Sequence, residues 1–343
     1  MAALTRLRDH RALTRRLDLR APLRALPLLL VVALAACTGT SFSPPTATST
    51  PVPTVATSSS PVAVSPTLAP AFPVTIVDDE GTSVSIAEAP ARIVSLTPAA
   101  TETLFAIGAG DRLVAKVEDI TPFPPEADGL PVVATYKGVD IEKVVALEAD
   151  LVIAGGLGFT PPDAVAQLRG LGIPVIVLYA ASLEGALGGI EAVGAATGEL
   201  GAAVALTSAM RAEITRLSGL VAGLDKPRTF YEVDATTDIY TVPADSLYAE
   251  MLTLAGADPI TTDASYQITL ENLITANPSL ILLGDGGYTK PEDVAARPGW
   301  SGISAVVDGR ITAVDDTLIT RPGPRLVDGL RALIRAIHPE VQP

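Results

Sequence analysis

Short apolar runs rich in β-branched residues alternate with segments of helical periodicity from about residue 90 onward. These runs have no polar face, which is typical of strands buried on both sides in a parallel sheet. Parallel strands need crossover connections, and these are usually helices. The alternation therefore predicts an α/β fold with mainly parallel sheets covered by helices. The expected strands lie at 92–96, 112–117, 150–155, 174–179, 228–233, 279–284 and 310–315.

One long helical pattern interrupts this alternation over residues 199–224. Apolar residues recur there at spacings of three and four from Ala203 to Val221, and Lys226-Pro227 ends the pattern. We therefore expect two α/β lobes, 72–198 and 225–343, joined by this helix. Shorter helical patterns cover 98–109, 140–149, 161–172, 246–255, 269–276 and 324–337.

The first 36 residues have the organisation of a signal peptide. Residues 1–24 carry seven arginines against two aspartates, and twelve uncharged residues follow from Ala25 to Ala36. This apolar stretch is shorter than the roughly 20 residues that a transmembrane helix needs. Leu34-Ala35-Ala36-Cys37 resembles the bacterial lipobox, which predicts acylation of Cys37. An ordinary secretory signal with an incidental cysteine is the alternative.

The segment after Cys37 is expected to be a tether. Residues 38–71 contain no charged residue, fifteen Ser or Thr and seven Pro, a composition that cannot bury enough apolar surface to fold. Residues 37–71 are therefore interpreted as a lipid-anchored linker on the outer face of the cytoplasmic membrane, on its periplasmic or extracellular side. The folded part begins near Phe72.

Charge and residue counts exclude several function classes. Taking the +5 of residues 1–24 away from the formal −14 leaves about −19, which disfavours nucleic acid and anionic lipid as partners. A single cysteine cannot form a disulfide within one chain. The two histidines are His10 and His338, too few for a hydrolase with a conventional nucleophile and base or for a multi-histidine zinc or manganese receptor. We expect no resident metal or cofactor, and a solvent-facing His338.

Several motifs, in order and spacing, resemble one family of binding proteins. They are "APARIVSLTPAATETLFAIGAGDRLV", "LPVVATYKGVDIEKVVALEADLVIAGG", "ITLENLITANPSLILL" and "RPGPRLVDGL". The family is that of the helical-backbone substrate-binding proteins of ABC importers, which capture cobalamin, haem or ferric siderophores. The resemblance covers 74–337. It implies two Rossmann-like lobes bridged by one helix, with the ligand in the cleft between them.

The resemblance also implies partners and a role without catalysis. The protein is expected to be a monomer that delivers its ligand to a permease dimer with a cytoplasmic ATPase. Glu142 and Glu271 match the glutamates that dock into the two permease subunits in this family. The alternative from the residues alone is that each is a favourable acid in the first turn of a helix. Glu102 is interpreted as a first-turn acid bordering the cleft.

Open α/β sheets bind ligands at the carboxyl ends of their strands, here the loops 97–98, 118–125, 154–160, 234–241, 284–290 and 315–323. Aromatic faces suit corrin, porphyrin or catechol rings. Arg321 is the candidate for a ligand carboxylate or phosphate, whereas Arg325 is either a second candidate or a structural ion-pair partner. Trp300 is expected to pack in a core. The aromatic candidates for ligand contact are Phe123, Tyr136, Phe159, Tyr240 and Tyr266.

The chain departs from the family at two positions, and its sequence leaves two other functions open. Gly155-Gly156 and Tyr266 stand where a cobalamin-binding relative carries tryptophans, which weakens a specific cobalamin assignment. A surface-tethered sensor without transport is the alternative function, since a binding fold does not prove import. A dinucleotide oxidoreductase is a remote one, because neither "GGLGF" nor "GDGGY" completes the G-x-G-x-x-G spacing.

Overall fold

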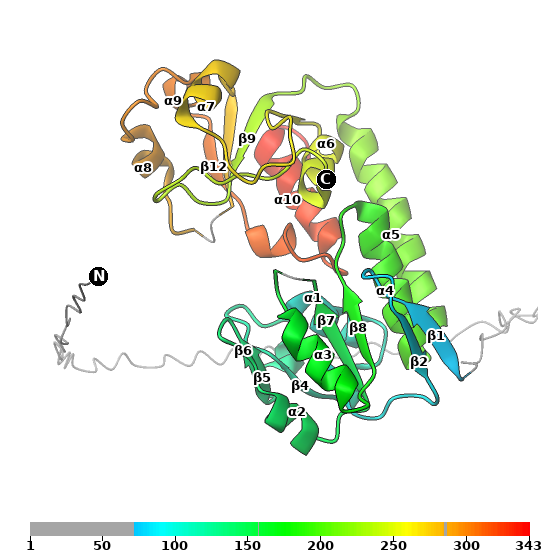
Figure 1. Cartoon of the computed structure of the whole chain (residues 1–343). Coiled ribbons are helices and arrows are strands. Elements are labelled where there is room, and N and C mark those ends of the chain that lie inside the picture. Colours follow the sequence, from blue (N-terminus) through cyan, green and yellow to red (C-terminus); the bar gives the residue numbers. More distant parts are fainter. Residues whose placement is uncertain (1–71, 157, 285–286) are drawn as a thin grey trace, which may run out of the picture. The chain divides into compact units, whose positions relative to one another are not determined.

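The computed structural model describes residues 72–156, 158–284 and 287–343 (Figure 1). The expected signal peptide (1–36), Cys37 and the rest of the expected linker to residue 71 lie outside these ranges. Within them, no helix has both the length and the hydropathy required to cross a bilayer.

The N-terminal lobe is built on a six-stranded sheet with the order β6-β5-β4-β3-β7-β8. All neighbours are parallel except β5 and β6, so helices connect most of the strands. An antiparallel hairpin, β1 with β2, precedes the sheet. The elements are β1 (Val74–Val77), β2 (Ser83–Ile86), β3 (Ile93–Ser95), α1 (Pro98–Ala106), β4 (Leu113–Val117), β5 (Val132–Thr135), β6 (Gly138–Val139), α2 (Ile141–Ala146), β7 (Leu151–Gly155), α3 (Pro162–Gly170) and β8 (Val175–Leu178), with short 3-10 turns at Gly110–Arg112 and Pro125–Ala127.

The C-terminal lobe has a four-stranded sheet, all parallel, with the order β10-β9-β11-β12. One face is closed by a core in which Phe230 and Trp300 meet edge to face at 6.2 Å, which confirms the packing role expected for Trp300. The elements are β9 (Arg228–Glu232), α6 (Leu247–Leu254), β10 (Asp258–Pro259), α7 (Leu270–Ala276), β11 (Leu280–Leu283), α8 (Pro291–Ala295), α9 (Ser304–Val307), β12 (Ile311–Ala313), a 3-10 turn at Asp316–Leu318 and α10 (Leu326–Ile337).

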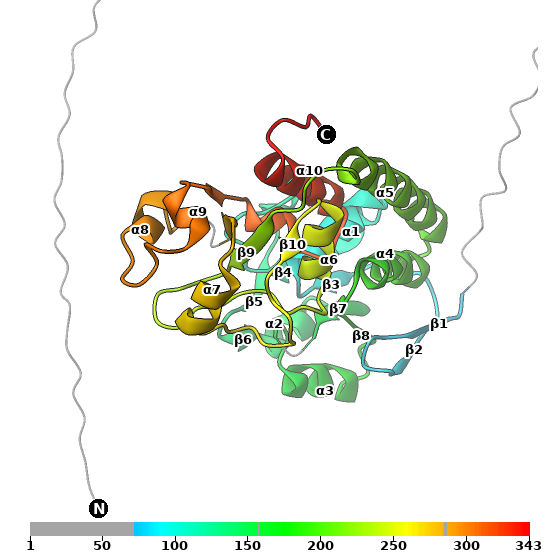
Figure 2. The same ribbon diagram turned by 90° about the horizontal axis from the view of Figure 1, so that it is seen from above.

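The chain passes from the N-terminal to the C-terminal lobe through the long helix α5 (Leu200–Val221), and α4 (Leu183–Thr197) packs along it. Figure 2 shows them beside each other at one side of the molecule. α5 lies within the range predicted for the long helix, whereas the sequence pattern did not predict α4. Gly198 joins them in the left-handed conformation, which a residue without Cβ adopts most readily.

α5 is in contact with both lobes at its two ends. Before its first residue, Glu199 pairs with Arg112 of the N-terminal lobe at 2.9 Å. Near its last residue, the Val221 side chain lies against Gly256 of the C-terminal lobe. One apolar cluster accordingly runs from the N-terminal sheet through α4, α5 and α10.

His338, expected to face solvent, is 4% exposed. It follows α10 directly, and its Nε2 lies 3.3 Å from the carbonyl oxygen of Gly256. The expectation was wrong because the last helix ends inside the interface with the loop after α6, so its C-terminal residue is covered.

Candidate ligand-binding cleft

A cavity of about 1450 Å³ lies between the two lobes. This volume exceeds the roughly 300–1,000 Å³ of ordinary small-molecule pockets. One wall comes from the N-terminal lobe, the opposite wall from the C-terminal lobe, and the α4 helix closes one side between Gly185 and Val193. The cleft therefore has room for a large organic ligand.

The cavity lies at the carboxyl ends of β3, β7, β8 and β12, because the loops after these strands converge there. Five of the six loops expected at the cleft contribute to its wall. The sixth, 234–241, does not: Tyr240 forms antiparallel bridges with Asp234 and Gln267, which place this loop in a small ladder. Residues 243 and 245–248 line the cavity instead.

Two of the predicted aromatic contacts, Phe159 and Tyr266, line the cavity, and their side chains are 66% and 60% exposed. Tyr179 and Tyr288 line it as well, although they were not among the candidates. Tyr179 directly follows β8, and Tyr288 lies in an expected cleft loop. Both could therefore have been predicted from their positions after strands. Apolar rings thus face the cavity from both lobes.

The glycines after β7 make room for these rings. A Cβ on Gly155 would lie 2.8 Å from the Phe159 Cβ, and a Cβ on Gly156 would lie 2.7 Å from the Tyr179 ring. Real Cβ atoms do not approach this closely, so larger residues would displace the aromatic side chains. The two glycines, which depart from the family pattern, therefore form part of the construction of the wall.

Phe123 and Tyr136 do not line the cavity. Phe123 lies below the guanidinium of Arg325, whose central carbon is 4.3 Å from the ring centroid. Tyr136 follows β5 in a tight turn, is 90% exposed and lies near the Lys137 ammonium. The family resemblance made both residues candidates for ligand contact, but the Phe123 ring packs against Arg325 and the Tyr136 ring is exposed to solvent.

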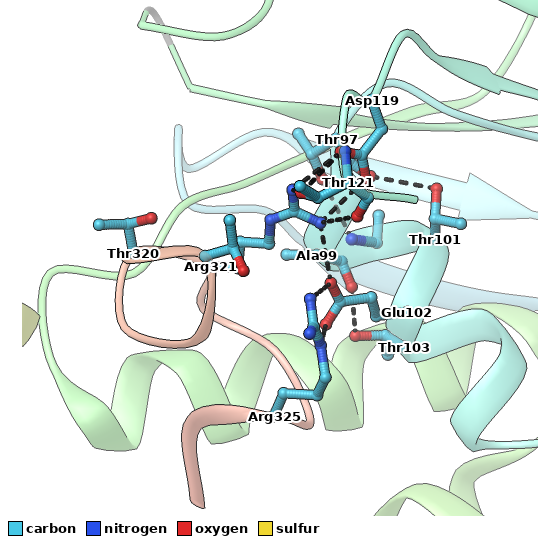
Figure 3. A network of polar contacts seen from close by, with 12 residues as sticks. Thr97, Ala99, Thr101, Glu102, Thr103, Asp119, Thr121, Thr320, Arg321 and Arg325 are labelled. Atoms are coloured by element: carbon cyan, nitrogen blue, oxygen red, sulfur yellow. Dashed lines mark hydrogen bonds and ion pairs between the residues drawn. The ribbon is translucent and has the colours of Figure 1, made fainter. Parts of the chain in front are cut away.

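Arg321 lines the cavity, but its guanidinium is already bound to the N-terminal lobe (Figure 3). Nη1 and Nη2 donate to the two carboxylate oxygens of Asp119 at 2.9 and 2.8 Å. Nη1 also donates to Glu102, and Nη2 donates to the Thr121 hydroxyl. This bidentate geometry is the strong form of an arginine–carboxylate contact.

Glu102 lies in the interior of α1, and its side chain is only 1% exposed. It accepts hydrogen bonds from Arg325 at 2.6 and 3.0 Å and from Arg321 at 3.1 Å. The interpretation as a first-turn acid bordering the cleft was therefore wrong, since α1 begins four residues earlier and turns this side chain towards the C-terminal lobe. Arg325 is a structural ion-pair partner, the alternative that the sequence left open.

The electrostatics of this network favour the ionised forms. Burial of Asp119 acts to raise its pKa, but hydrogen bonds from Arg321 and Thr121 and the charge of Arg321 outweigh it, so the pKa lies below the ordinary value of 3.8. Hydrogen bonds to Glu102 raise the pKa of Arg325. The network therefore favours the charged forms of Asp119 and Arg325.

Glu142 and Glu271 are both exposed, and the helices that carry them, α2 and α7, belong to different lobes (Figure 1). Glu142 lies in the first turn of α2, where Asp140 caps the helix, and Glu271 lies in the first turn of α7, where Thr269 caps it. These positions leave both carboxylates accessible to a partner.

Two α/β lobes, a helical connection and a large cleft lined from both sides define a two-lobed binding protein. The family model described as "Periplasmic binding protein" matches residues 93–318. The chain thus belongs to the periplasmic binding protein family.

Three relatives illustrate the range of this family. The uncharacterized ABC transporter substrate-binding lipoprotein YvrC of Bacillus subtilis is 35% identical over 276 residues, covering 78% of this chain and 87% of YvrC. The structure of the periplasmic vitamin B12-binding protein BtuF of Vibrio cholerae aligns with a TM-score of 0.63 at 27% identity, over 72% of this chain and 96% of BtuF. A periplasmic heme-binding protein of Pseudomonas aeruginosa aligns with a TM-score of 0.65 at 28% identity, over 74% and 95% of the two chains.

Proposed function

We propose that this chain is the extracytoplasmic substrate-binding lipoprotein of an ABC importer. Its ligand would be a metal chelate: a cobalamin or other corrinoid, haem or a ferric siderophore. The observation that carries the proposal is the cleft of about 1450 Å³ with aromatic side chains exposed in it from both lobes. A large planar ligand can stack on such faces while the two lobes enclose its edges.

The relatives support this ligand class. BtuF binds vitamin B12 and the Pseudomonas protein binds haem, as their names state, and both share the two-lobed fold with this chain. Of the candidates for ligand contact, Phe159 and Tyr266 are carried forward, together with Tyr179 and Tyr288, because the cavity wall contains them. Arg321 also lines the cavity, but its guanidinium is bound to Asp119 and Glu102.

The site of action follows from the first residues of the chain. The lipobox-like sequence ending at Cys37 supports acylation of this cysteine, and the YvrC relative is named a lipoprotein. Acyl chains partition into a bilayer by about 0.8 kcal/mol per buried methylene. The binding domain would then stand on the outer face of the cytoplasmic membrane, tethered through residues 37–71.

Delivery to the permease would use Glu142 and Glu271. Both are exposed acids, and they are on different lobes. Two charges at separate ends of one body fix orientation and raise encounter rate more than they raise affinity. A surface-tethered sensor without transport would have the same cleft but no need of these two side chains.

Absorbance titration and native mass spectrometry test the proposal. The whole chain with Cys37→Ser, which cannot be acylated, is titrated with cyanocobalamin, haemin and several ferric siderophores. One-to-one binding of one of these at submicromolar concentration is the expected result. Absence of binding to all of them would overturn the proposed ligand class.

A further inference from the structure

The charged groups in the cleft are almost all acidic. Five carboxylate residues line the described part of its wall, and the accompanying lysines and arginines amount to Arg321 alone. Two of the acids, Asp79 and Glu80, come from the hairpin before the N-terminal sheet, and the others come from the C-terminal lobe. The full set is Asp79, Glu80, Asp245, Asp315 and Asp316.

Three of these carboxylates form no ion pair with any described residue. Asp79 accepts a hydrogen bond from the Tyr179 backbone at 2.7 Å, and Asp315 accepts from the backbone and hydroxyl of Thr317. Asp245 is exposed to the cavity. None of the three carboxylates is cancelled by a paired cation, although the charge of Asp315 acts on Arg325 and helps to raise its pKa. All three border the cavity.

The single lining arginine does not balance this charge. Arg321 faces two carboxylates of the N-terminal lobe, Asp119 and Glu102, through both terminal nitrogens. A ligand carboxylate could take these nitrogens only by displacing Asp119, which would leave a carboxylate of 7% exposure without its cation. Such a buried unpaired charge is costly.

Low-dielectric walls carrying one sign of charge focus the field into the space between them. An anionic ligand entering this cleft would meet unpaired carboxylates and find its potential cation occupied. A neutral or cationic ligand of the same shape would meet neither penalty. The difference in binding free energy discriminates against the anionic ligand.

We propose that the cleft selects neutral or cationic ligands against anionic ligands of the same shape, with Asp245 and Asp315 as specificity-determining residues. The inference rests on the proposed function in taking this cleft as the ligand site. It favours a corrinoid with peripheral amides over haem with two ionised propionates or a polyanionic ferric siderophore.

A matched corrinoid pair tests the selectivity. Cyanocobalamin is compared with the derivative in which one peripheral amide is hydrolysed to a carboxylate, so that shape is kept and one negative charge is added. The carboxylate is expected to bind about 5- to 10-fold more weakly at low ionic strength, with a smaller difference at high salt. Equal or tighter binding of the carboxylate would overturn the inference and leave the proposed function intact.

Two double variants assign the effect to the cleft. Asp245→Asn with Asp315→Asn should reduce the penalty on the carboxylate. Asp225→Asn with Asp308→Asn removes the same charge from exposed positions of the same lobe that do not line the cavity, and should leave the penalty unchanged. An equal change in both double variants would mean that net charge, not the cleft, discriminates.

A second measurement needs no ligand. A neutral fluorophore is attached to Ala264→Cys, a cavity-lining position, in the chain with Cys37→Ser, and is quenched with caesium or iodide ions. Each quenching constant is divided by that of the free fluorophore in solution. The resulting ratio should be about twofold higher for caesium than for iodide at low salt, and the Asp245→Asn, Asp315→Asn pair should bring the two ratios together. A ratio for iodide as high as that for caesium would overturn the inference. If no metal chelate binds, the proposed function fails, and this measurement still decides the charge of the cleft.

Discussion

Arg325 and Glu102 are 223 residues apart in the chain, and two hydrogen bonds of 2.6 and 3.0 Å join them across the lobe boundary. Arg321 reinforces this contact from the same segment (Figure 3). An ion-pair network therefore joins the two lobes beside the cleft, with the cations from one lobe and the anions from the other.

Removal of Arg325 should destabilise the protein. Arg325→Met leaves the buried Glu102 with Arg321 as its remaining cation, and we expect a loss of about 2 to 4 kcal/mol in the free energy of unfolding. Urea denaturation measures this loss. Arg335→Met, at an exposed position of α10, the helix that Arg325 precedes, is the control and should change stability little. Equal losses in both variants would contradict the role of the network.

Acid should weaken the same network. The pKa of Asp119 lies below 3.8 in the folded protein, so its contribution to stability is complete above that value and is lost as the pH falls through the folded pKa. The melting temperature should fall on acidification from pH 5 to 2.5, and Asp119→Asn should fall less over this interval while melting lower at pH 6. Circular dichroism follows both curves, and parallel curves for the two proteins would refute the assignment.

The close packing of α4 on α5 should make Gly194 intolerant of a side chain. A Cβ there would lie 2.4 Å from the Ala203 Cβ, so Gly194→Ala should cost about 1 to 3 kcal/mol through overpacking, although alanine is the better helix former. Gly188→Ala in the same helix meets no atom within 4 Å and should be neutral or stabilising by up to about 1 kcal/mol. Thermal unfolding of the two variants, compared with the parent, decides whether the helices touch here.

Aromatic residues of the cleft should contribute to ligand affinity, and aromatic residues outside it should not. Phe159→Ala and Tyr266→Ala should each weaken binding by about 1 to 3 kcal/mol through lost apolar contact. Tyr136→Ala is the matched control, because this ring is exposed but does not line the cavity. A loss of affinity confined to Tyr136→Ala would move the ligand away from the cleft.

Uptake should depend on Glu142 and Glu271 even where ligand binding does not. The double variant Glu142→Ala, Glu271→Ala should bind ligand normally and fail to support uptake in cells that need the importer, because neither side chain lines the cleft. Normal uptake by the double variant would favour another docking surface. If uptake is also normal in cells lacking the whole protein, the sensor function would be favoured.

Periodicity was sufficient for most of the sheets and the long helix. The buried runs at 150–155 and 279–284 are found as β7 and β11. A strand buried on both faces has apolar residues at consecutive positions, and such a run is visible in the sequence. α4 was not predicted, since its glycines lower helix propensity and only the structure shows that Gly194 serves a close approach to α5.

Side-chain partners in the cleft were less accessible to prediction. The position of Arg321 in a loop after a strand predicted that it lies at the cleft. The partners of its guanidinium, however, are about 200 residues earlier in the chain, and the spacing of residues in the sequence does not predict such a distant contact. Tyr136 was misplaced for a related reason: a residue at a strand end can face the cleft or the solvent, and one turn decides which.

Because α5 is long, a small bend in it produces a displacement of several ångströms at most at its far end. Its 22 residues extend about 33 Å at 1.5 Å per residue, and about 27 Å of this length follows Ala203. A bend of about 5° near the Gly194–Ala203 contact would therefore displace the Val221 end by about 2 Å. Helices bend by such amounts with only slight lengthening of their hydrogen bonds. The aperture of the cleft can thus be widened by elastic curvature of a continuous helix, with no peptide unit changing its conformational class.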